Sequence, residues 1–325
     1  MREMFCLTVG ELAFLSKECL PKSDLVVTRA SSLTYPVNHS ILFAKNRGVL
    51  DRADLSGLRN SLILVPPAEA EQVTGLSDPS NVIAPVVNPR LSYARLMSAA
   101  LSSIPRPDVQ YIARNGAIVA ESASIPPDCV VEPGVFIDHG VTVGARVQIL
   151  SGAVIRAYTT IGDGTIIRER AVIGSAGFGF ERDENGVAVR LPHVGGVQIG
   201  CNVEIGALSV VCSGTIDPTV VKDGVKIDNF VQVSHNCVIG TGTMIAACAD
   251  LSGSVHIGDY SWIAPNSTIL ESRHVGDRAT VGIGAVVLRD IDDDGVVAGN
   301  PARAMEGVSR PRGWGGTIST NQPDR

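Results

Sequence analysis

The chain has 325 residues, of which 45% are hydrophobic, 4% aromatic and 18% charged, with a formal net charge of -6. This acidic balance argues against nucleic acid as a partner, because phosphate backbones attract basic proteins. No apolar run reaches the length of a membrane helix, and the first twenty residues carry too many charges for a signal peptide, so we expect a cytoplasmic protein without a membrane span.

Residues 1–104 lack any long repeat and predict a small α/β domain. Thr8 is a candidate N-cap for a first helix, and residues 61–65 have the composition of a buried strand. Apolar residues at helical spacing follow Asn88 and predict a second helix. We place the domain boundary at the proline pair of residues 105 and 107, because proline ends a helix.

We assign about residues 108–300 to a repeat in which an aliphatic residue returns at every sixth position over long stretches. The pattern is unbroken between Val221 and Val287 and also runs from Ile125 to Ile173. Neither a helix nor an ordinary sheet has this period. A parallel β-helix does, if each hexapeptide forms one side of a three-sided coil and points its first residue inward. We therefore predict a mainly β protein with a hexapeptide-repeat β-helix.

The repeat is interrupted twice, at about residues 175–198 and at residues 213–220. Insertions in repeat proteins tend to lie on the binding face, so these loops are candidate functional segments. The first contains Phe178 and Phe180 among glycines, which suits a ligand pocket, although two phenylalanines that anchor the loop are an equally simple interpretation. Residues 301–325 are rich in glycine and proline and predict a short irregular tail.

His235 lies two residues after an inward position. The register of inward positions places it beside Ser213 and Gly253 of the adjoining coils, and such small neighbours leave room for a substrate. Imidazole is the side chain best suited to move a proton near neutral pH. A solvated surface histidine is the alternative interpretation.

His256 and His274 are eighteen residues apart and therefore occupy the same position on successive coils, at a strand spacing of about 4.8 Å. Such a pair suits a metal ion. However, His235 lies roughly 10 Å along the chain direction from this row, too far to complete a three-histidine site within one chain. Exposed histidines without a metal are the favoured interpretation.

In these features the chain resembles the hexapeptide-repeat acyltransferases, and among them the UDP-3-O-acylglucosamine N-acyltransferases of lipid A synthesis. The segments that carry the resemblance are residues 32–46, 88–94, 173–180, 192–197, 203–207 and 226–236. The resemblance implies a left-handed β-helix, a homotrimer, and active sites in the grooves between subunits.

The resemblance also implies roles for individual residues. His235 would act as the base that takes a proton from a sugar amine as the amine attacks a thioester carbonyl. Phe43 and Asn46 would bind a uridine nucleotide within residues 1–104. The family's second histidine aligns with Ser272, two residues from His274. Candidates for oxyanion or supporting contacts are His274 and Gly253, and candidates for the substrate or acyl pocket are Phe178, Phe180, Asn229 and Asn236.

No tightly bound cofactor is implied, and the cosubstrate would be an acyl thioester of acyl carrier protein or coenzyme A, with a nucleotide sugar as acceptor. The chain departs from the family pattern at Cys212 and Ser213, where the family has Asp and Arg, and residues 299–303 resemble the end of hexapeptide acetyltransferases that use coenzyme A. The alternatives are an acetyl-CoA-dependent sugar N-acetyltransferase for surface polysaccharide, a metal-dependent solenoid of the carbonic anhydrase type, and a solenoid without catalysis.

Overall fold

The computed structural model describes residues 3–105 and 108–305, which form two compact units. The N-terminal unit comprises the residues up to Asp108 together with Phe178–Gly195 and Thr215–Asp217. The solenoid unit comprises Val109–Gly177, Gly196–Gly214 and the described residues from Pro218 onward. Both predicted interruptions of the repeat therefore contribute residues to the N-terminal unit. The predicted domain of residues 1–104 did not include these residues.

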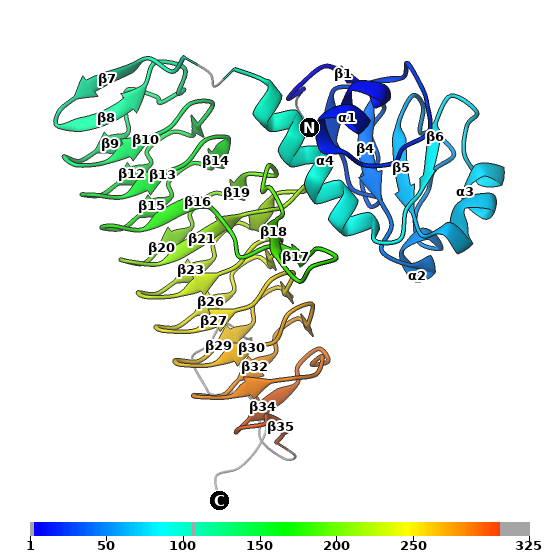
Figure 1. The fold of residues 1–325 in the computed structure, drawn as a ribbon. Coiled ribbons are helices and arrows are strands. Elements are labelled where there is room, and N and C mark those ends of the chain that lie inside the picture. The colour runs from blue at the N-terminus through cyan, green and yellow to red at the C-terminus, as the bar shows by residue number, and fades with distance from the viewer. Residues whose placement is uncertain (1–2, 106–107, 306–325) are drawn as a thin grey trace, which may run out of the picture. The chain divides into compact units, whose positions relative to one another are not determined.

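The N-terminal unit is built on a parallel four-stranded sheet in the order β3-β4-β5-β6 (Figure 1). A second pair, β1 and β2, is antiparallel, as is the hairpin β17–β18. The elements of the unit are β1 (Leu7–Thr8), α1 (Val9–Ser16), β2 (Val26–Val27), β3 (Arg29–Ala30), β4 (Ser40–Phe43), α2 (Arg47–Leu50), β5 (Leu62–Val65), the short 3-10 helix η1 (Pro67–Glu69), α3 (Ala70–Leu76), β6 (Val82–Pro85), α4 (Pro89–Ser103), β17 (Phe180–Arg182) and β18 (Ala188–Arg190).

The caps of two helices confirm the predicted helix starts. The Thr8 hydroxyl accepts a hydrogen bond from the backbone N–H of Glu11 at 3.1 Å, and the Glu11 carboxylate accepts one from the backbone N–H of Thr8 at 2.7 Å. The Asn88 side chain accepts from the backbone N–H of Leu91 at 3.0 Å, so α4 begins directly after it. Such caps satisfy N–H groups that have no partner within the helix.

Alternate residues of the central sheet face two separate cores. On one side Leu62 and Leu64 pack with Met97 of α4, and on the other Ile63 and Val65 pack in a second cluster. A parallel sheet covered on both faces requires apolar residues on both, which is why β5 reads as a continuous aliphatic run.

The solenoid unit has three parallel sheets, and each coil contributes one short strand to each (Figure 1). Sheet I contains β7 (Tyr111–Arg114), β8 (Ala117–Ala120), β10 (Phe136–Ile137), β13 (Val154–Ile155), β16 (Val172–Ala176), β21 (Val210–Ser213), β24 (Gln232–Val233), β27 (Asp250–Leu251), β30 (Thr268–Ile269) and β33 (Val286–Val287), and only β7 runs antiparallel to its neighbour.

Sheet II contains β11 (Thr142–Val143), β14 (Thr159–Ile161), β19 (Val197–Ile199), β22 (Thr219–Val221), β25 (Val238–Ile239), β28 (His256–Ile257) and β31 (His274–Val275). Sheet III contains β9 (Val130–Val131), β12 (Gln148–Ile149), β15 (Ile166–Ile167), β20 (Glu204–Ile205), β23 (Lys226–Ile227), β26 (Met244–Ile245), β29 (Trp262–Ile263), β32 (Thr280–Val281), β34 (Val296–Ala298) and β35 (Arg303–Ala304). The chain visits sheets III, I and II in turn.

The six-residue period is confirmed as the inward row of the solenoid. Every residue of that row between Val221 and Val287 is buried in one continuous aliphatic core. The glycine that follows an inward residue allows the close approach of the next coil: a Cβ added at Gly240 would lie 2.3 Å from the carbonyl carbon of Gly258. The fourth residue of many hexapeptides turns the corner with positive φ, as in Leu208 (61°) and Phe230 (58°).

The first excursion from the repeat is held within the N-terminal unit by ion pairs and apolar contacts. Arg90 of α4 pairs with Glu181 of β17, and Arg95 pairs with Glu184 at 2.7 Å. Leu191 is buried in the same core as α4. The hairpin thus completes the N-terminal unit.

The prediction of an irregular tail from residue 301 onward was wrong at the start of that tail. Arg303–Ala304 forms β35, which pairs antiparallel with β34. Residues 306–325 of that tail lie outside the described residues. Among the described helices, none has the length and apolar character needed to cross a bilayer.

Candidate functional site

His235 occupies the corner between sheets I and II, where β24 ends. Its imidazole lies against Gly253 of the next coil, as the eighteen-residue register predicted: a Cβ added to Gly253 would lie 2.6 Å from His235 Cε1 and 2.8 Å from Nε2. Only glycine leaves this space open without displacing the ring. The absence of a side chain at position 253 therefore allows the imidazole to occupy this position.

Asn236 fixes the other edge of the imidazole. Its Oδ1 lies 3.0 Å from His235 Nδ1. Asn236 turns the corner with φ 61°, a conformation that asparagine tolerates better than most residues, and its backbone N–H donates to Thr219 Oγ1 at 2.9 Å. In the tautomer in which Nδ1 carries the hydrogen and donates to Asn236, Nε2 is the basic nitrogen. The nitrogen that lies over Gly253 is then the one able to accept a proton.

The cysteines near this corner are buried. Burial raises the pKa of the Cys237 thiol to about 12, so it stays protonated at neutral pH. Cys212, on the coil before His235, is also buried and accepts a hydrogen bond from Gln232 Nε2 at 3.3 Å. Ser213 accepts a hydrogen bond from the backbone N–H of Gly196 at 3.0 Å. In this neighbourhood, imidazole is the group suited to proton transfer at neutral pH.

His256 and His274 pair in register on β28 and β31, in sheet II, and both side chains are exposed. Val238 follows His235 on the same coil. His256 lies one coil beyond Val238 and His274 lies two coils beyond it, so His274 is separated from the His235 corner. Among the described residues, no group of three His, Cys, Asp or Glu side chains could hold a metal ion.

Three comparisons bear on the family. The family described as bacterial transferase hexapeptide (six repeats) matches residues 140–175 and 218–249. A UDP-3-O-acylglucosamine N-acyltransferase of Coxiella burnetii (strain Dugway 5J108-111) is 36% identical over 186 residues, which cover 51% of this chain and 53% of that protein. A UDP-3-O-acylglucosamine N-acyltransferase of Cupriavidus pinatubonensis is 31% identical over 310 residues, covering 89% of this chain and 85% of that protein.

The chain belongs to the UDP-3-O-acylglucosamine N-acyltransferase family. It spans about half the length of several curated relatives, such as the Coxiella protein, and most of the length of the Cupriavidus protein. The resemblance inferred from the repeat and its motifs is confirmed.

Solved structures support the same assignment of the fold. UDP-N-acetylglucosamine acyltransferase from Campylobacter jejuni has a TM-score of 0.54 and 26% identity, over 59% of this chain and 73% of that chain. The enzyme of the same name from Francisella novicida has a TM-score of 0.55 and 25% identity, over 59% of this chain and 69% of that one. The predicted left-handed parallel β-helix is confirmed by this likeness.

The residues expected to bind the nucleotide in this N-acyltransferase family member lie in the N-terminal unit. Phe43 ends β4 and packs against Tyr93 with ring centroids 4.8 Å apart. The Asn46 side chain caps α2 by accepting from the backbone N–H of Val49 at 3.2 Å. Both therefore have structural contacts, and their binding role stays a prediction.

Phe178 and Phe180 belong to the excursion that joins the N-terminal unit. Their rings meet edge to face at 5.0 Å, and the Arg190 guanidinium lies 4.5 Å above the Phe180 ring. Phe178 is 89% exposed. The pair thus presents an aromatic surface to solvent, and its assignment to a substrate or acyl pocket stays a prediction.

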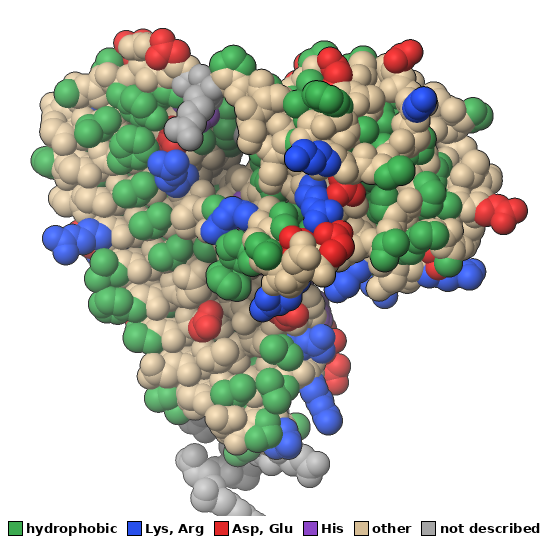
Figure 2. Space-filling model, in the orientation of Figure 1, with side chains coloured by type: hydrophobic (Ala, Val, Ile, Leu, Met, Phe, Trp, Pro, Cys, Tyr) green, Lys and Arg blue, Asp and Glu red, His purple; other side chains and the backbone are tan. Residues whose placement is uncertain are grey.

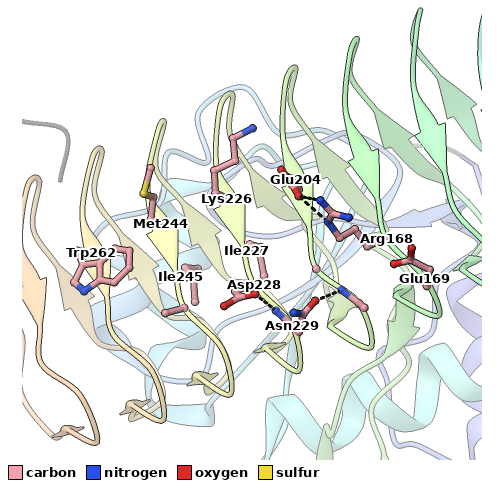
Figure 3. Close-up of a pocket in the computed structure, with 13 residues that line it drawn as sticks. Arg168, Glu169, Glu204, Lys226, Ile227, Asp228, Asn229, Met244, Ile245 and Trp262 are labelled. Carbon is pink, nitrogen blue, oxygen red and sulfur yellow. Dashed lines mark hydrogen bonds and ion pairs between the residues drawn. The ribbon is translucent and has the colours of Figure 1, made fainter. Parts of the chain in front are cut away.

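Asn229 lies in a different place from His235, beside a hollow of about 640 Å³ on sheet III (Figure 3). Its Oδ1 accepts a hydrogen bond from the backbone N–H of Ala207 at 2.7 Å. The side chains of Lys226, Met244 and Trp262 stand along the hollow, and Arg168 pairs with Glu204 at 2.6 Å (Figure 3). The structure therefore does not bring Asn229 to the His235 corner within one chain.

Two features were missed from the sequence: the half-buried carboxyl of Asp217 and the contact between Asn236 and His235. Asp217 lies in the second excursion, and burial raises the pKa of its carboxyl, while a hydrogen bond with Ser32 opposes this rise. The interruption of the repeat was the available signal. The contact between Asn236 and His235 was also missed, although an amide directly after a candidate base could have suggested it.

Proposed function

We propose that the protein is an N-acyltransferase that moves an acyl group from a thioester donor to the amine of a nucleotide-linked amino sugar, as the name of its relatives describes. The observation that carries the proposal is the His235 corner. Its imidazole has one nitrogen beside the Asn236 amide oxygen and the other over Gly253. Family membership supplies the substrate class.

The reaction requires one group that acts first as a base and then as an acid. His235 Nε2 accepts a proton from the sugar amine as the nitrogen attacks the thioester carbonyl and a C–N bond forms. When the tetrahedral intermediate collapses, the C–S bond breaks and the thiolate takes the proton from the His235 imidazolium. The products are an amide and a thiol, and the imidazole is again neutral.

Gly253 is suited to stabilise the oxyanion of that intermediate. Within the described residues its backbone N–H makes no hydrogen bond, and it lies beside the imidazole that would act as base. A preorganised backbone donor next to the reacting carbonyl stabilises the developing charge. His274 stands on sheet II and would have to act from another subunit to take this role.

The acceptor would be held by its nucleotide, with Phe43 and Asn46 as base-binding residues, and the enzyme would work as a homotrimer, as in the family it resembles. The donor is an acyl carrier protein or coenzyme A thioester. Residues 299–303, which resemble the end of coenzyme A-dependent acetyltransferases, favour testing acetyl-CoA as a second donor.

The test combines product analysis with a matched pair of variants. The protein is incubated with a panel of UDP-amino sugars and with long-chain acyl carrier protein or acetyl-CoA, and amide products are identified by mass spectrometry. His235→Ala should lower turnover about 10²–10⁴-fold with little change in nucleotide-sugar affinity, because a general base contributes on that order. His256→Ala is the control and should remain active. Nearly full turnover by His235→Ala would refute the mechanism.

A further inference from the structure

A second histidine occupies the same kind of corner as His235. His139 lies two residues after the inward Ile137, which is also the spacing between His235 and its own inward residue, and both histidines stand where the chain passes from sheet I to sheet II. Four strand steps of sheet I separate the two corners, roughly 19 Å at the usual strand spacing. They are therefore too far apart to act on the same carbonyl group.

A buried carboxylate holds the imidazole of His139. Asp138 Oδ1 lies 2.8 Å from His139 Nδ1, and it also accepts hydrogen bonds from the His139 backbone N–H at 2.8 Å and from the Tyr111 hydroxyl at 2.9 Å. Arg156 Nη1 lies 3.4 Å from the other carboxylate oxygen. The Asp138 side chain is 6% exposed and the His139 side chain 22% exposed, so the carboxylate lies behind a ring that solvent still reaches.

The carboxylate fixes which ring nitrogen carries the hydrogen. Burial alone would raise the pKa of the Asp138 carboxyl, but hydrogen bonds from His139 and Tyr111 and the charge of Arg156 lower it, so the group is ionised at neutral pH. An ionised carboxylate can only accept, so Nδ1 of the imidazole donates and Nε2 is the basic nitrogen. Among the described residues, none forms a hydrogen bond with Nε2. This nitrogen is therefore available to accept a proton.

The next coil offers a hydrogen-bond donor at the matching place. Ala157 lies eighteen residues after His139, the spacing that relates Gly253 to the other corner, and its backbone N–H makes no hydrogen bond within the described part of the chain. A small residue with an unused N–H beside an imidazole suits an oxyanion. Tyr158 follows, meets the His139 ring edge to face at 4.9 Å and is 38% exposed. The corner thus combines a base, a donor and an aromatic surface.

Two more aromatic rings lie around the Asp138 carboxylate. Tyr111 is 42% exposed and packs on Phe136 with ring centroids 5.4 Å apart, and the Arg156 guanidinium lies 5.8 Å from the Phe136 ring. On the solenoid face in view in Figure 2, hydrophobic side chains recur from coil to coil and charged ones are sparse. A flat aromatic group gains contact area on exposed rings, so these surroundings favour a substrate that carries one.

We propose that the His139 corner is a second catalytic site, which hydrolyses aryl esters of small carboxylic acids. His139 Nε2 accepts a proton from water as the water oxygen attacks the ester carbonyl and a C–O bond forms. The Ala157 N–H donates to the oxyanion. When the intermediate collapses, the bond between the carbonyl carbon and the aryloxy oxygen breaks, and the imidazolium returns the proton to that oxygen. The products are a carboxylic acid and a phenol.

Asp138 is a positioning residue in this site, because it touches the imidazole and not the ester. Asp138→Asn replaces an acceptor by an amide that can donate to Nδ1, which favours the tautomer with the hydrogen on Nε2. We expect kcat for ester hydrolysis to fall about tenfold or more, since that tautomer cannot accept a proton at Nε2, while KM stays the same. A higher KM with an unchanged kcat would contradict this role.

Hydrolysis of p-nitrophenyl acetate by the full chain tests the site. The parent protein and all variants carry His235→Ala, which removes the other candidate base from the measurement. His139→Gln keeps an N–H that can donate to Asp138 but has no basic nitrogen, and His256→Gln makes the same exchange at an exposed histidine. We expect His139→Gln to lower kcat/KM about 10²–10⁴-fold, because a general base contributes on that order, and His256→Gln to leave it unchanged.

Three results would overturn the proposal. They are hydrolysis by the parent protein no faster than by free imidazole at the same concentration, equal losses in the two glutamine variants, and no loss in His139→Gln. If His139→Gln does not fold, kcat and KM of Asp138→Asn decide. The assay contains neither nucleotide sugar nor acyl thioester, so its outcome is independent of the proposed acyl transfer.

Discussion

The two units of the molecule build their cores in different ways. In the solenoid unit each strand pairs with the strand one coil away, as Val233 pairs with Leu251, so contacts in the stack join consecutive coils, and an excursion only lengthens the chain between them. In the N-terminal unit the core that surrounds α4 also takes in Leu191 and Ile216, from two much later segments. The solenoid gains stability coil by coil, whereas the N-terminal unit is complete only when both excursions have returned.

This difference predicts which part of the molecule loses stability when a core residue is substituted. A defect in the solenoid core should act on the coils next to it, because their stacking depends on each other. A substitution in an excursion should destabilise the N-terminal unit, although the excursion lies within the sequence of the solenoid. Variants in each region can separate the two cases.

The largest effect should come from a charge in the inward stack. Ile257→Asp places a carboxylate where the native side chain is buried, and the cost of an unpaired buried charge, about 4 kcal/mol or more, should unfold the coils around it. Its outward neighbour His256 is exposed, so His256→Asp is the matched control. Thermal melts should show a large loss for the first and little change for the second. An unchanged melt for Ile257→Asp would disprove the register.

A smaller effect is expected from Leu191→Ala. Removing this buried side chain should cost about 2–5 kcal/mol and act on the N-terminal unit. Hydrogen exchange should speed up in α4 while β30 keeps its protection. Val187→Ala, at an exposed position of the same hairpin, is the control. Loss of protection spread evenly over both units would show that the excursion belongs to the solenoid core.

Gly253→Ala should damage activity more than stability. The added Cβ would lie 2.6 Å from His235 Cε1, so the imidazole must move. A displacement near 1 Å lowers turnover about 10²-fold. Gly57→Ala, with open space around the new Cβ, should leave turnover unchanged. If Gly253→Ala turns over at the wild-type rate, the ring position is not critical.

The smallest effect concerns Asp138 at the N-terminal end of the solenoid. Burial alone would raise the pKa of its carboxyl, but hydrogen bonds from His139 and Tyr111, together with Arg156, outweigh burial and lower it. A lowered folded-state pKa stabilises the fold above the unfolded value of about 3.9 and the contribution is lost as pH falls through the folded-state value.

Asp138→Asn should therefore cost about 1–3 kcal/mol at pH 7, because the hydrogen bonds from His139 and Tyr111 would then go to a neutral amide oxygen instead of a carboxylate. The difference from wild type should shrink as pH falls below about 4, toward the folded-state pKa. Urea denaturation between pH 7 and pH 2.5 measures both quantities. A constant difference over this range would mean that Asp138 does not titrate as inferred.

The solenoid and the position of His235 could be predicted from sequence because both follow from a local period. Six residues define one side, eighteen define one coil, and the neighbour of His235 is then Gly253. The composition of the N-terminal unit could not be predicted, because nothing in the sequence near Leu191 or Ile216 records the distant helix on which they pack. The contact of Asn236 with His235 depends on side-chain rotamers, which a repeat does not specify.

The positive φ at the solenoid corners has a consequence for protein engineering. Leu208 and Phe230 adopt a conformation that costs a side chain with Cβ on the order of 1 kcal/mol, and Phe230 is 59% exposed. Glycine or asparagine at these two positions would relieve the strain and raise the melting temperature of an isolated chain. The same exchange would remove apolar area from the exposed edge between sheets I and III, so it would also make that edge more polar.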